Sequence, residues 1–197
     1  MYTVLGLAAT RAFRVLWMLE ELGLEYEHQP HPPRAKEMLD VNPSGKVPAL
    51  VVDNQIVLDS VAIMQFLADK HDGLTYAAGT VLRAQQDSFT HFINDEVDAI
   101  LWCAARNTFI LPKDKRVPEI KETLKWEFSQ SMKTLETRLG DNEFLMGDKI
   151  TTPDILLTHC GGWAKNAGFD LPDGPLRAYF KRLTTRPAYL RAHALRG

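Results

Sequence analysis

The stretch Asn42-Pro43-Ser44-Gly45-Lys46-Val47-Pro48-Ala49-Leu50 sets the expected path of the first part of this 197-residue chain. Pro48 precedes the apolar run Ala49-Leu50-Val51-Val52. Proline has no N–H group for a strand ladder, so the strand must open at Pro48 rather than contain it. We predict a cis bond between Val47 and Pro48, which suits a tight turn into a strand. The N–H and C=O groups of Val47 would then face outward and be open to an extended ligand.

Asp59 and Ser60 stand at the start of a predicted helix. Apolar residues recur at helical spacing from Val61 to Leu67, directly after a short strand predicted over residues 55–58. Free N–H groups and the helix dipole at such a start attract a carboxylate. The alternative is that Asp59 or Ser60 serves only as an N-cap. The dipeptide alone favours the cap, whereas the Gly-Lys-Val-Pro turn upstream favours an anion site.

These two stretches together resemble the glutathione-binding site of the glutathione S-transferases, in which a (Val/Ile)-Pro strand start precedes a (Glu/Asp)-Ser helix start at about this separation. The resemblance runs along the whole chain. It implies that Val47, ahead of Pro48, pairs through its backbone with the cysteinyl part of glutathione. It also implies that Ser60 and the helix N-terminus hold the γ-glutamyl carboxylate, with Asp59 orienting the γ-glutamyl amine. Lys46 would meet the glycyl carboxylate, or else be an exposed turn lysine.

The pattern up to residue 72 predicts the order βαβαββα. The expected elements are a strand over 2–7, a helix from near Thr10 to Gly23, a strand over 25–28, a short helix over 34–39, strands from 48 and 55, and a helix from 59. Charged residues lie between the apolar positions of the first helix: Arg11, Arg14, Glu20 and Glu21. A parallel pair joined by a helix, then an antiparallel hairpin and a last helix, is the order of the thioredoxin-like fold, which the glutathione transferases use.

Residues 73–80 lose periodicity and gather small side chains, which predicts a linker. We therefore expect a thioredoxin-like domain over 1–72 and an all-helical domain over 81–197, where apolar residues recur at spacings of three and four. Thr151-Thr152-Pro153-Asp154 predicts a capping box, with Ile150 and Ile155 as the hydrophobic staple. Its expected role is in folding rather than in chemistry.

Composition argues against several classes of protein. A net charge of −2, with 45% hydrophobic and 24% charged residues, gives no reason to expect nucleic acid or an anionic membrane as a partner. The cysteines, Cys103 and Cys160, form no Cys-x-x-Cys pair and no cluster with histidine, so we expect neither a disulfide framework nor a metal. No basic leader and no apolar run near the roughly 20 residues of a membrane span are present. We expect a cytoplasmic protein.

A transferase must also hold the glutathione thiol as a thiolate, the form that attacks an electrophile. Family members of the serine type carry a catalytic Ser four residues before an Arg at the start of the first helix. Counted back from Arg11, that position is Leu7, which has no hydroxyl, and the nearest hydroxyl is that of Thr10. A hydrogen bond to a charged group contributes about 1.5–3 kcal/mol, against about 0.3–1 kcal/mol for a helix dipole. We take Thr10 as the candidate catalytic residue; the alternatives are that it is an N-cap, or that backbone N–H groups near Ala9 and Thr10 activate the thiol.

The helical part is expected to supply the electrophile pocket. Its candidate wall is Trp102, Arg106, Phe109 and Trp163, since aromatic rings with one cation suit an apolar or anionic acceptor. The alternative is that these side chains pack in the core.

The resemblance implies a cytoplasmic, homodimeric glutathione transferase of the detoxification type, which adds the glutathione thiolate to a small, apolar electrophile. Glutathione would be its co-substrate. Two other functions stay open: a non-catalytic interaction module on the same fold, and a carrier that binds glutathione or apolar ligands without turnover.

Overall fold

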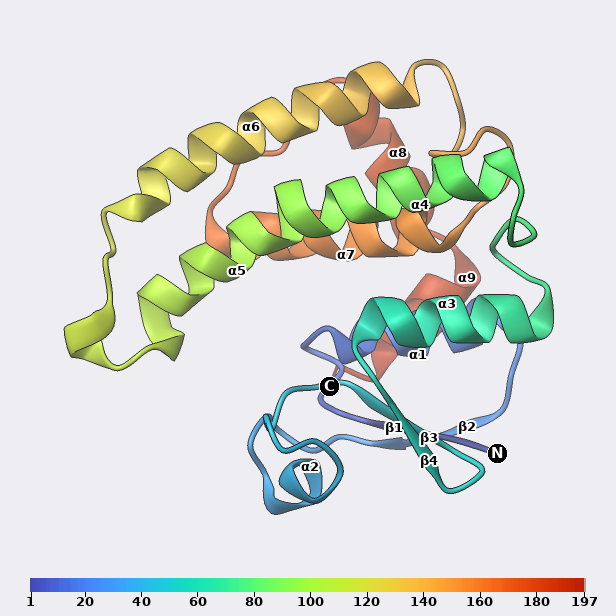
Figure 1. Cartoon of the computed structure of the whole chain (residues 1–197). Helices are drawn as coiled ribbons and strands as arrows, with labels where there is room; N and C mark the ends of the chain where they lie inside the picture. The colour runs from blue at the N-terminus through green and yellow to red at the C-terminus, as the bar shows by residue number, and fades with distance from the viewer. Residues whose placement is uncertain (197) are drawn as a thin grey trace. The chain divides into compact units, whose positions relative to one another are not determined.

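The structure, a computed structural model, describes residues 1–196 and divides into two compact units (Figure 1). The first unit joins residues 1–80 to the segment from Thr184 onward, and the second covers residues 81–183. The last segment groups with the first unit because its helix packs along the first helix of the chain. The predicted domain limits, 1–72, 73–80 and 81–197, stay predictions, and they did not anticipate this return of the chain.

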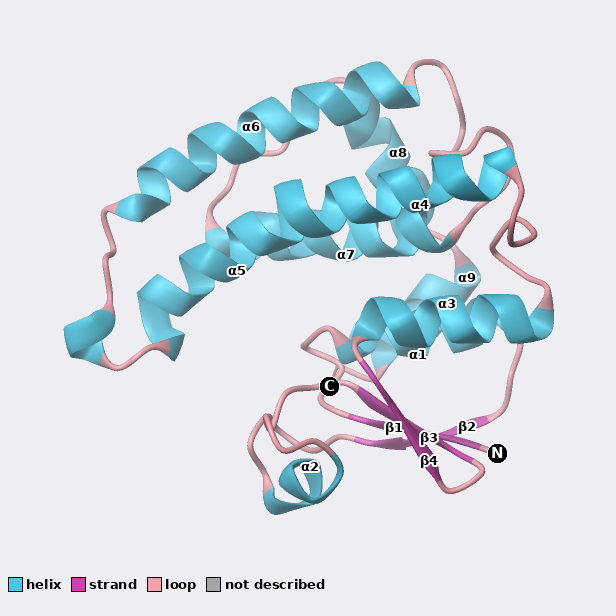
Figure 2. Ribbon diagram, viewed as in Figure 1, coloured by secondary structure: helices cyan, strands magenta, loops and turns pink. Residues whose placement is uncertain are grey.

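The first unit contains four strands and four α-helices among its described residues (Figure 2). They are β1 (Tyr2–Leu5), α1 (Ala12–Leu22), β2 (Tyr26–Gln29), α2 (Lys36–Val41), β3 (Ala49–Val52), β4 (Gln55–Leu58), α3 (Ser60–His71) and α9 (Pro187–Ala194). The predicted order βαβαββα is confirmed up to α3. β1 is shorter than the predicted strand because the chain turns at Gly6, where φ is 133°.

The strands form one mixed sheet in the order β2-β1-β3-β4. β1 runs parallel to β2 and antiparallel to β3, and β4 is antiparallel to β3, as the thioredoxin-like order predicts. Ala49 pairs with Leu5 on one side and with Leu58 on the other. The segment after β1, the segment before β3 and the segment after β4 therefore all leave the sheet at the same end.

Helix α1 is buried on almost every side. Its residues from Ala12 to Leu19 are all buried, and it packs against α3, α9 and β1. The charged positions predicted between its apolar residues do not form a solvent face. Arg14 is only 1% exposed, and the Glu21 carboxylate receives two hydrogen bonds of 2.7 Å from Arg186, just before α9. A charged residue at a buried position needs such a partner, and α9 supplies it.

The second unit is helical throughout its described length, as predicted. Its elements are α4 (Val81–Ile93), the π-helical turn η1 (Asn94–Asp98), α5 (Ala99–Ala105), the π-helical turn η2 (Arg106–Ile110), the 3-10 turn η3 (Lys113–Lys115), α6 (Ile120–Leu139), α7 (Thr152–Ala167) and α8 (Pro175–Thr184). In residues 1–196, no helix is both long and apolar enough to cross a membrane.

The predicted capping box at the start of α7 is confirmed. Asp154 is fully buried, and its carboxylate accepts hydrogen bonds from the N–H and hydroxyl of Thr151, from the N–H of Leu145 and from the hydroxyl of Tyr179. Burial raises the pKa of Asp154, while these four donors act in the opposite direction. The box therefore ties α7 to α8 and to the loop before it.

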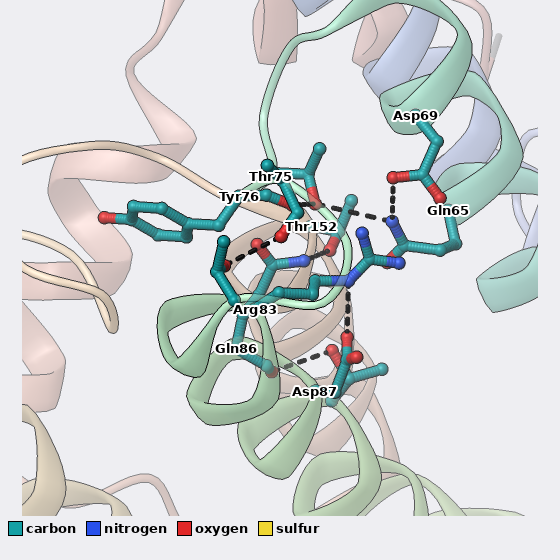
Figure 3. A network of polar contacts seen from close by, with 11 residues as sticks. Gln65, Asp69, Thr75, Tyr76, Arg83, Gln86, Asp87 and Thr152 are labelled. Atoms are coloured by element: carbon teal, nitrogen blue, oxygen red, sulfur yellow. Dashed lines mark hydrogen bonds and ion pairs between the residues drawn. The ribbon is translucent and has the colours of Figure 1, made fainter.

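Polar contacts are present on both sides of the predicted linker, each within its own unit (Figure 3). In the first unit the Gln65 amide donates to Asp69 at 3.1 Å and to Thr75 at 3.4 Å. In the second unit the buried Gln86 amide donates to the Thr152 hydroxyl at 3.2 Å and so joins α4 to α7.

Candidate functional site

The candidate site lies at the end of the sheet where three segments of the first unit leave it. The loop after β1 rests directly on the turn before β3: a Cβ atom added to Gly6 would lie 2.9 Å from the Cβ of Val47. Only a glycine allows this approach, since Gly6 also has a φ of 133°. The β1–α1 loop and Val47 thus form one surface.

The Val47-Pro48 peptide bond is cis, as predicted. The Val47 side chain is partly buried and packs on a cluster that includes Leu5 and Ala49. Within residues 1–196, no other residue forms a hydrogen bond with the backbone N–H or C=O of Val47. Both backbone groups are therefore open to an extended partner.

Asn42 holds the turn that precedes Val47. Its amide donates to the carbonyl of Lys46 at 2.9 Å, and its side-chain oxygen accepts from the N–H and hydroxyl of Ser44. Asn42 is 8% exposed, whereas the Lys46 side chain is exposed. No function was predicted for Asn42 from the sequence, although an asparagine before Pro-x-Gly is a common turn signal.

Asp59 caps α3. Its carboxylate accepts from the N–H groups of Val61 at 2.9 Å and Ala62 at 3.1 Å, and its φ of 73° is in the left-handed region. The alternative that Asp59 is an N-cap is therefore confirmed; its contact with an amine stays a prediction. In the described part of the chain, the N–H of Ser60 has no acceptor, so it is the donor that this first helical turn leaves open.

Arg14 stands behind Ser60. Its Nη1 donates to the Ser60 hydroxyl at 3.2 Å, and the two residues are 1% and 2% exposed. A guanidinium in this position adds a full positive charge to the partial charge of the helix N-terminus. Arg14 was not predicted as a site residue; the available signal was a charged side chain between Phe13 and Val15, in the apolar first half of α1.

Thr10 forms a local turn in this structure. Its hydroxyl donates to the carbonyl of Leu7 at 2.6 Å and accepts from the N–H of Ala12 at 3.2 Å. The backbone N–H of Thr10 donates to the same Leu7 carbonyl at 2.9 Å. Thr10 lies one residue before the N-cap of α1, which is Arg11, so the alternative that Thr10 is the N-cap is not confirmed. The N–H of Thr10 is already engaged and is not open to a thiolate. Of the two backbone groups named for activation, that leaves the one at Ala9.

The predicted electrophile wall lies in the second unit and is only partly buried. Trp102 on α5 and Trp163 on α7 are half-buried, and these two helices pack together. Arg106 and Phe109 lie on η2 and are exposed to solvent; the exposed fraction of Phe109 is 63%. The predicted pocket therefore stays a prediction.

Two open hollows of the second unit involve other residues. One, of about 510 Å³, is lined by His91, Phe92, Asn94, Asp95 and Glu96. The other, of about 330 Å³, is lined by Phe92, Glu96, Trp126, Glu127, Gln130, Ser131 and Thr134. Over residues 1–196, no group of three or more His, Cys, Asp or Glu side chains could hold a metal ion.

Two segments of the chain match the two domains of one protein family. Residues 10–70 match the family described as "Glutathione S-transferase, N-terminal domain", and residues 95–187 match "Glutathione S-transferase, C-terminal domain". A probable glutathione S-transferase of Nicotiana tabacum is 28% identical over 154 residues, which cover 76% of this chain. The match spans 65% of the tobacco protein, slightly less than two thirds of its length.

Solved structures of glutathione transferases are similar to this chain over almost its full length. A glutathione transferase of Methylococcus capsulatus superposes with a TM-score of 0.88 at 27% identity, covering 100% of this chain and 99% of that one. The glutathione transferase URE2P6 of Phanerochaete chrysosporium, crystallised in complex with oxidized glutathione, superposes with a TM-score of 0.82 at 28% identity, covering 99% and 96% of the two chains. From both domain matches and this full-length similarity, the chain belongs to the glutathione S-transferase family.

Proposed function

We propose that this protein is a glutathione transferase that binds glutathione at the sheet end described above and adds its thiolate to a small electrophile. The observation that carries the proposal is the meeting of an open peptide backbone and a positively charged anion site at one end of one sheet. Val47 supplies the first, and Ser60 with Arg14 behind it supplies the second. A tripeptide with a carboxylate at one end needs both kinds of contact.

Each part of glutathione has a partner in this proposal. The cysteinyl backbone pairs with Val47, as an added strand would. The γ-glutamyl carboxylate accepts from the N–H and hydroxyl of Ser60, and the free oxygen of the Asp59 carboxylate faces the γ-glutamyl amine. Lys46, which is exposed on the turn before Pro48, meets the glycyl carboxylate.

Arg14 also supports the choice of Thr10 as the thiol-activating residue. The family spacing runs four residues back from an arginine at the start of the first helix, and Arg14, near that start, contacts Ser60. Four residues before Arg14 is Thr10, so the hydroxyl that Leu7 lacked at this position is present. The Thr10 hydroxyl turns from the Leu7 carbonyl to donate to the thiolate when glutathione binds.

The chemical step is a nucleophilic attack. The thiol proton leaves to solvent, the thiolate forms a carbon–sulfur bond with the electrophile, and the leaving group, where there is one, departs with the bonding electron pair. Trp102, Arg106, Phe109 and Trp163 are the proposed wall for the electrophile. The proposal extends to a cytoplasmic homodimer in detoxification, as the family resemblance implies.

One observation favours a second candidate, a carrier that binds glutathione without activating it. The Thr10 hydroxyl already has an acceptor at 2.6 Å, and a hydroxyl has a single proton to donate. In a carrier this bond would persist after glutathione binds.

Calorimetry with glutathione, followed by a titration of the thiolate absorbance of the bound tripeptide, tests the proposal. We expect binding that Ser60→Ala weakens and that Ser129→Ala, a change to a serine on α6, leaves unchanged. We further expect a thiol pKa below the value near 8.5 of a free cysteine, and turnover of an activated aryl halide. Binding with an unshifted pKa and no turnover would select the carrier, and a folded wild-type protein that binds no glutathione would exclude both candidates.

A further inference from the structure

The turn that joins α5 to α6 holds apolar side chains out in solvent. Phe109, Ile110 and Val117 are 63%, 43% and 54% exposed, and none of the five residues of η2 is buried. Figure 1 shows this turn at one extremity of the second unit, beyond the ends of α5 and α6 and away from α8. The two hollows of the second unit described above are lined by other residues. Ile110 and Val117 therefore protrude from a tip, outside both of these hollows.

The backbone of the tip is firmly held, so the exposure is a property of the fold. The Arg116 guanidinium donates to three carbonyls, those of Leu111 at 2.7 Å, Thr108 at 3.1 Å and Phe109 at 3.0 Å. The side chain of Asn107 accepts from the N–H of Val117 at 3.0 Å. These four hydrogen bonds hold the backbone that carries the exposed apolar side chains.

The same turn is basic in an acidic protein. Residues 106–121 contain five basic residues against two acidic ones, a formal charge of +3, whereas the whole chain carries −2. The cations are Arg106, Lys113, Lys115, Arg116 and Lys121. Lys113 and Lys115 are exposed on η3, close in sequence to the apolar side chains. Lys115 forms an ion pair with Asp114 at 3.3 Å.

We propose that this tip docks the protein on an anionic lipid surface, with Ile110 and Val117 entering the headgroup region and the lysines of η3 facing the lipid charges. Protruding apolar side chains ringed by lysine and arginine are the combination that binds such interfaces. The positive charge of the tip favours an anionic partner. Because its apolar side chains protrude, they can enter the headgroup region of a bilayer more readily than they can form a groove for a protein segment. This contact is peripheral and differs from a membrane span. The sequence-based expectation of no membrane partner rested on the charge of the whole chain and on the lack of a membrane-spanning run, whereas this proposal rests on the local charge of the tip.

Co-sedimentation of the full chain with vesicles tests the proposal. The probes are vesicles of phosphatidylcholine alone and vesicles in which roughly one quarter is phosphatidylserine. We expect wild-type protein to sediment with the anionic vesicles, to stay in solution with the neutral ones, and to be released by high salt, because screening removes the attraction.

Two pairs of variants locate the contact. Lys113→Gln with Lys115→Gln is expected to lower binding about tenfold or more, since each lysine near an anionic surface contributes roughly fivefold. Lys133→Gln with Lys165→Gln, exposed lysines elsewhere on the second unit, removes the same charge and is expected to change binding little. Ile110→Ser with Val117→Ser is expected to weaken binding, whereas Val81→Ser, at a side chain 74% exposed, is not.

Three results would overturn the proposal: no wild-type binding to anionic vesicles, equal binding to both vesicle types, or equal loss in the two lysine pairs. The first of these would be the result if the tip instead serves an acidic protein partner. Glutathione affinity of each variant, measured alongside, reports that the first unit is intact, because the altered residues all lie outside the glutathione site.

Discussion

The Arg14 guanidinium lies 3.2 Å from the Ser60 hydroxyl, and both side chains are almost completely buried. α1 and α3 thereby bring a full positive charge to the N-terminus of α3. A charge in that position costs desolvation unless an anion or a polar group offsets it. The contact links the stability of the first unit to its capacity for binding an anion.

Replacing Arg14 is expected to reduce glutathione affinity more than it perturbs the fold. Arg14→Met removes the positive charge that stands behind Ser60 and favours binding of the γ-glutamyl carboxylate. We take its contribution as that of a charge-assisted hydrogen bond, about 1.5–3 kcal/mol. Calorimetry is therefore expected to show a loss of glutathione affinity of about tenfold or more. Arg14→Lys keeps the charge and is the control, with an intermediate loss. Wild-type affinity in both variants would separate Arg14 from the site.

Substitutions at Thr10 test thiol activation. Thr10→Val keeps the shape but removes the donor, so the thiol pKa of bound glutathione is expected to rise by about one to two units, the equivalent of one hydrogen bond to a charge. Thr10→Ser retains a hydroxyl and is expected to keep the wild-type pKa. The absorbance of the thiolate as a function of pH measures both. An identical pKa in the valine and serine variants would transfer activation to the backbone at Ala9.

Gly6→Ala is expected to weaken both stability and glutathione binding. The new Cβ would lie 2.9 Å from the Cβ of Val47, and the φ of 133° strains any other residue, for a combined cost of about 2–4 kcal/mol. Gly79→Ala is the matched control, because Gly79 has a φ of 81° but no atom within 4 Å of an added Cβ. Urea unfolding of the two variants separates strain from clash. Equal losses would mean that contact with Val47 contributes nothing.

The bond between Glu21 and Arg186 is expected to fasten α9 to α1. The Glu21 side chain is 6% exposed and also accepts from the Trp17 indole at 2.9 Å. A double-mutant cycle with Glu21→Gln and Arg186→Gln is expected to give a coupling energy of about 2 kcal/mol, within the range of hydrogen bonds between charged groups. The exposed pair Glu122 and Lys125 on α6 is the control, with a coupling close to zero. Equal couplings would show that burial of the first pair brings no advantage.

Asp154→Asn is expected to lower the free energy of unfolding at neutral pH by about 2–4 kcal/mol, because an amide NH₂ would face the donors of Thr151. Burial raises the pKa of Asp154, so the folded state holds the proton more tightly than the unfolded chain. The wild-type protein should then gain stability relative to the variant as the pH falls toward the pKa of the unfolded carboxyl. Unfolding curves at neutral and weakly acidic pH measure both effects. A constant difference between the two pH values would contradict the direction of this shift.

Local chemistry made several features predictable. Pro48 at the start of an apolar run implied where β3 opens, and its turn implied the cis bond. Thr151 and Asp154, three residues apart, implied a capping box, because both hydrogen bonds close within one helical turn. Each of these features depends on neighbours within a few residues.

Other features depended on contacts that no local pattern contains. Arg14 and Glu21 lie between apolar positions, which normally indicates a solvent face, yet α3 and α9 cover them. Arg14 meets a residue 46 positions away, and Arg186 meets one 165 positions away. The hydroxyl of Thr10 could face a ligand or a carbonyl, and only the course of the β1–α1 loop brought it to Leu7.

By itself, then, the sequence determined the order of strands and helices, the turn before Pro48 and the family resemblance, because backbone restriction and periodicity are written in adjacent residues. The tertiary structure alone decided that Arg14 supports Ser60, that the last helix returns to the first unit, and that Ile110 and Val117 are held out in solvent. Burial and long-range pairing are settled by how helices pack, and the energies that select one packing are summed over residues far apart in the chain.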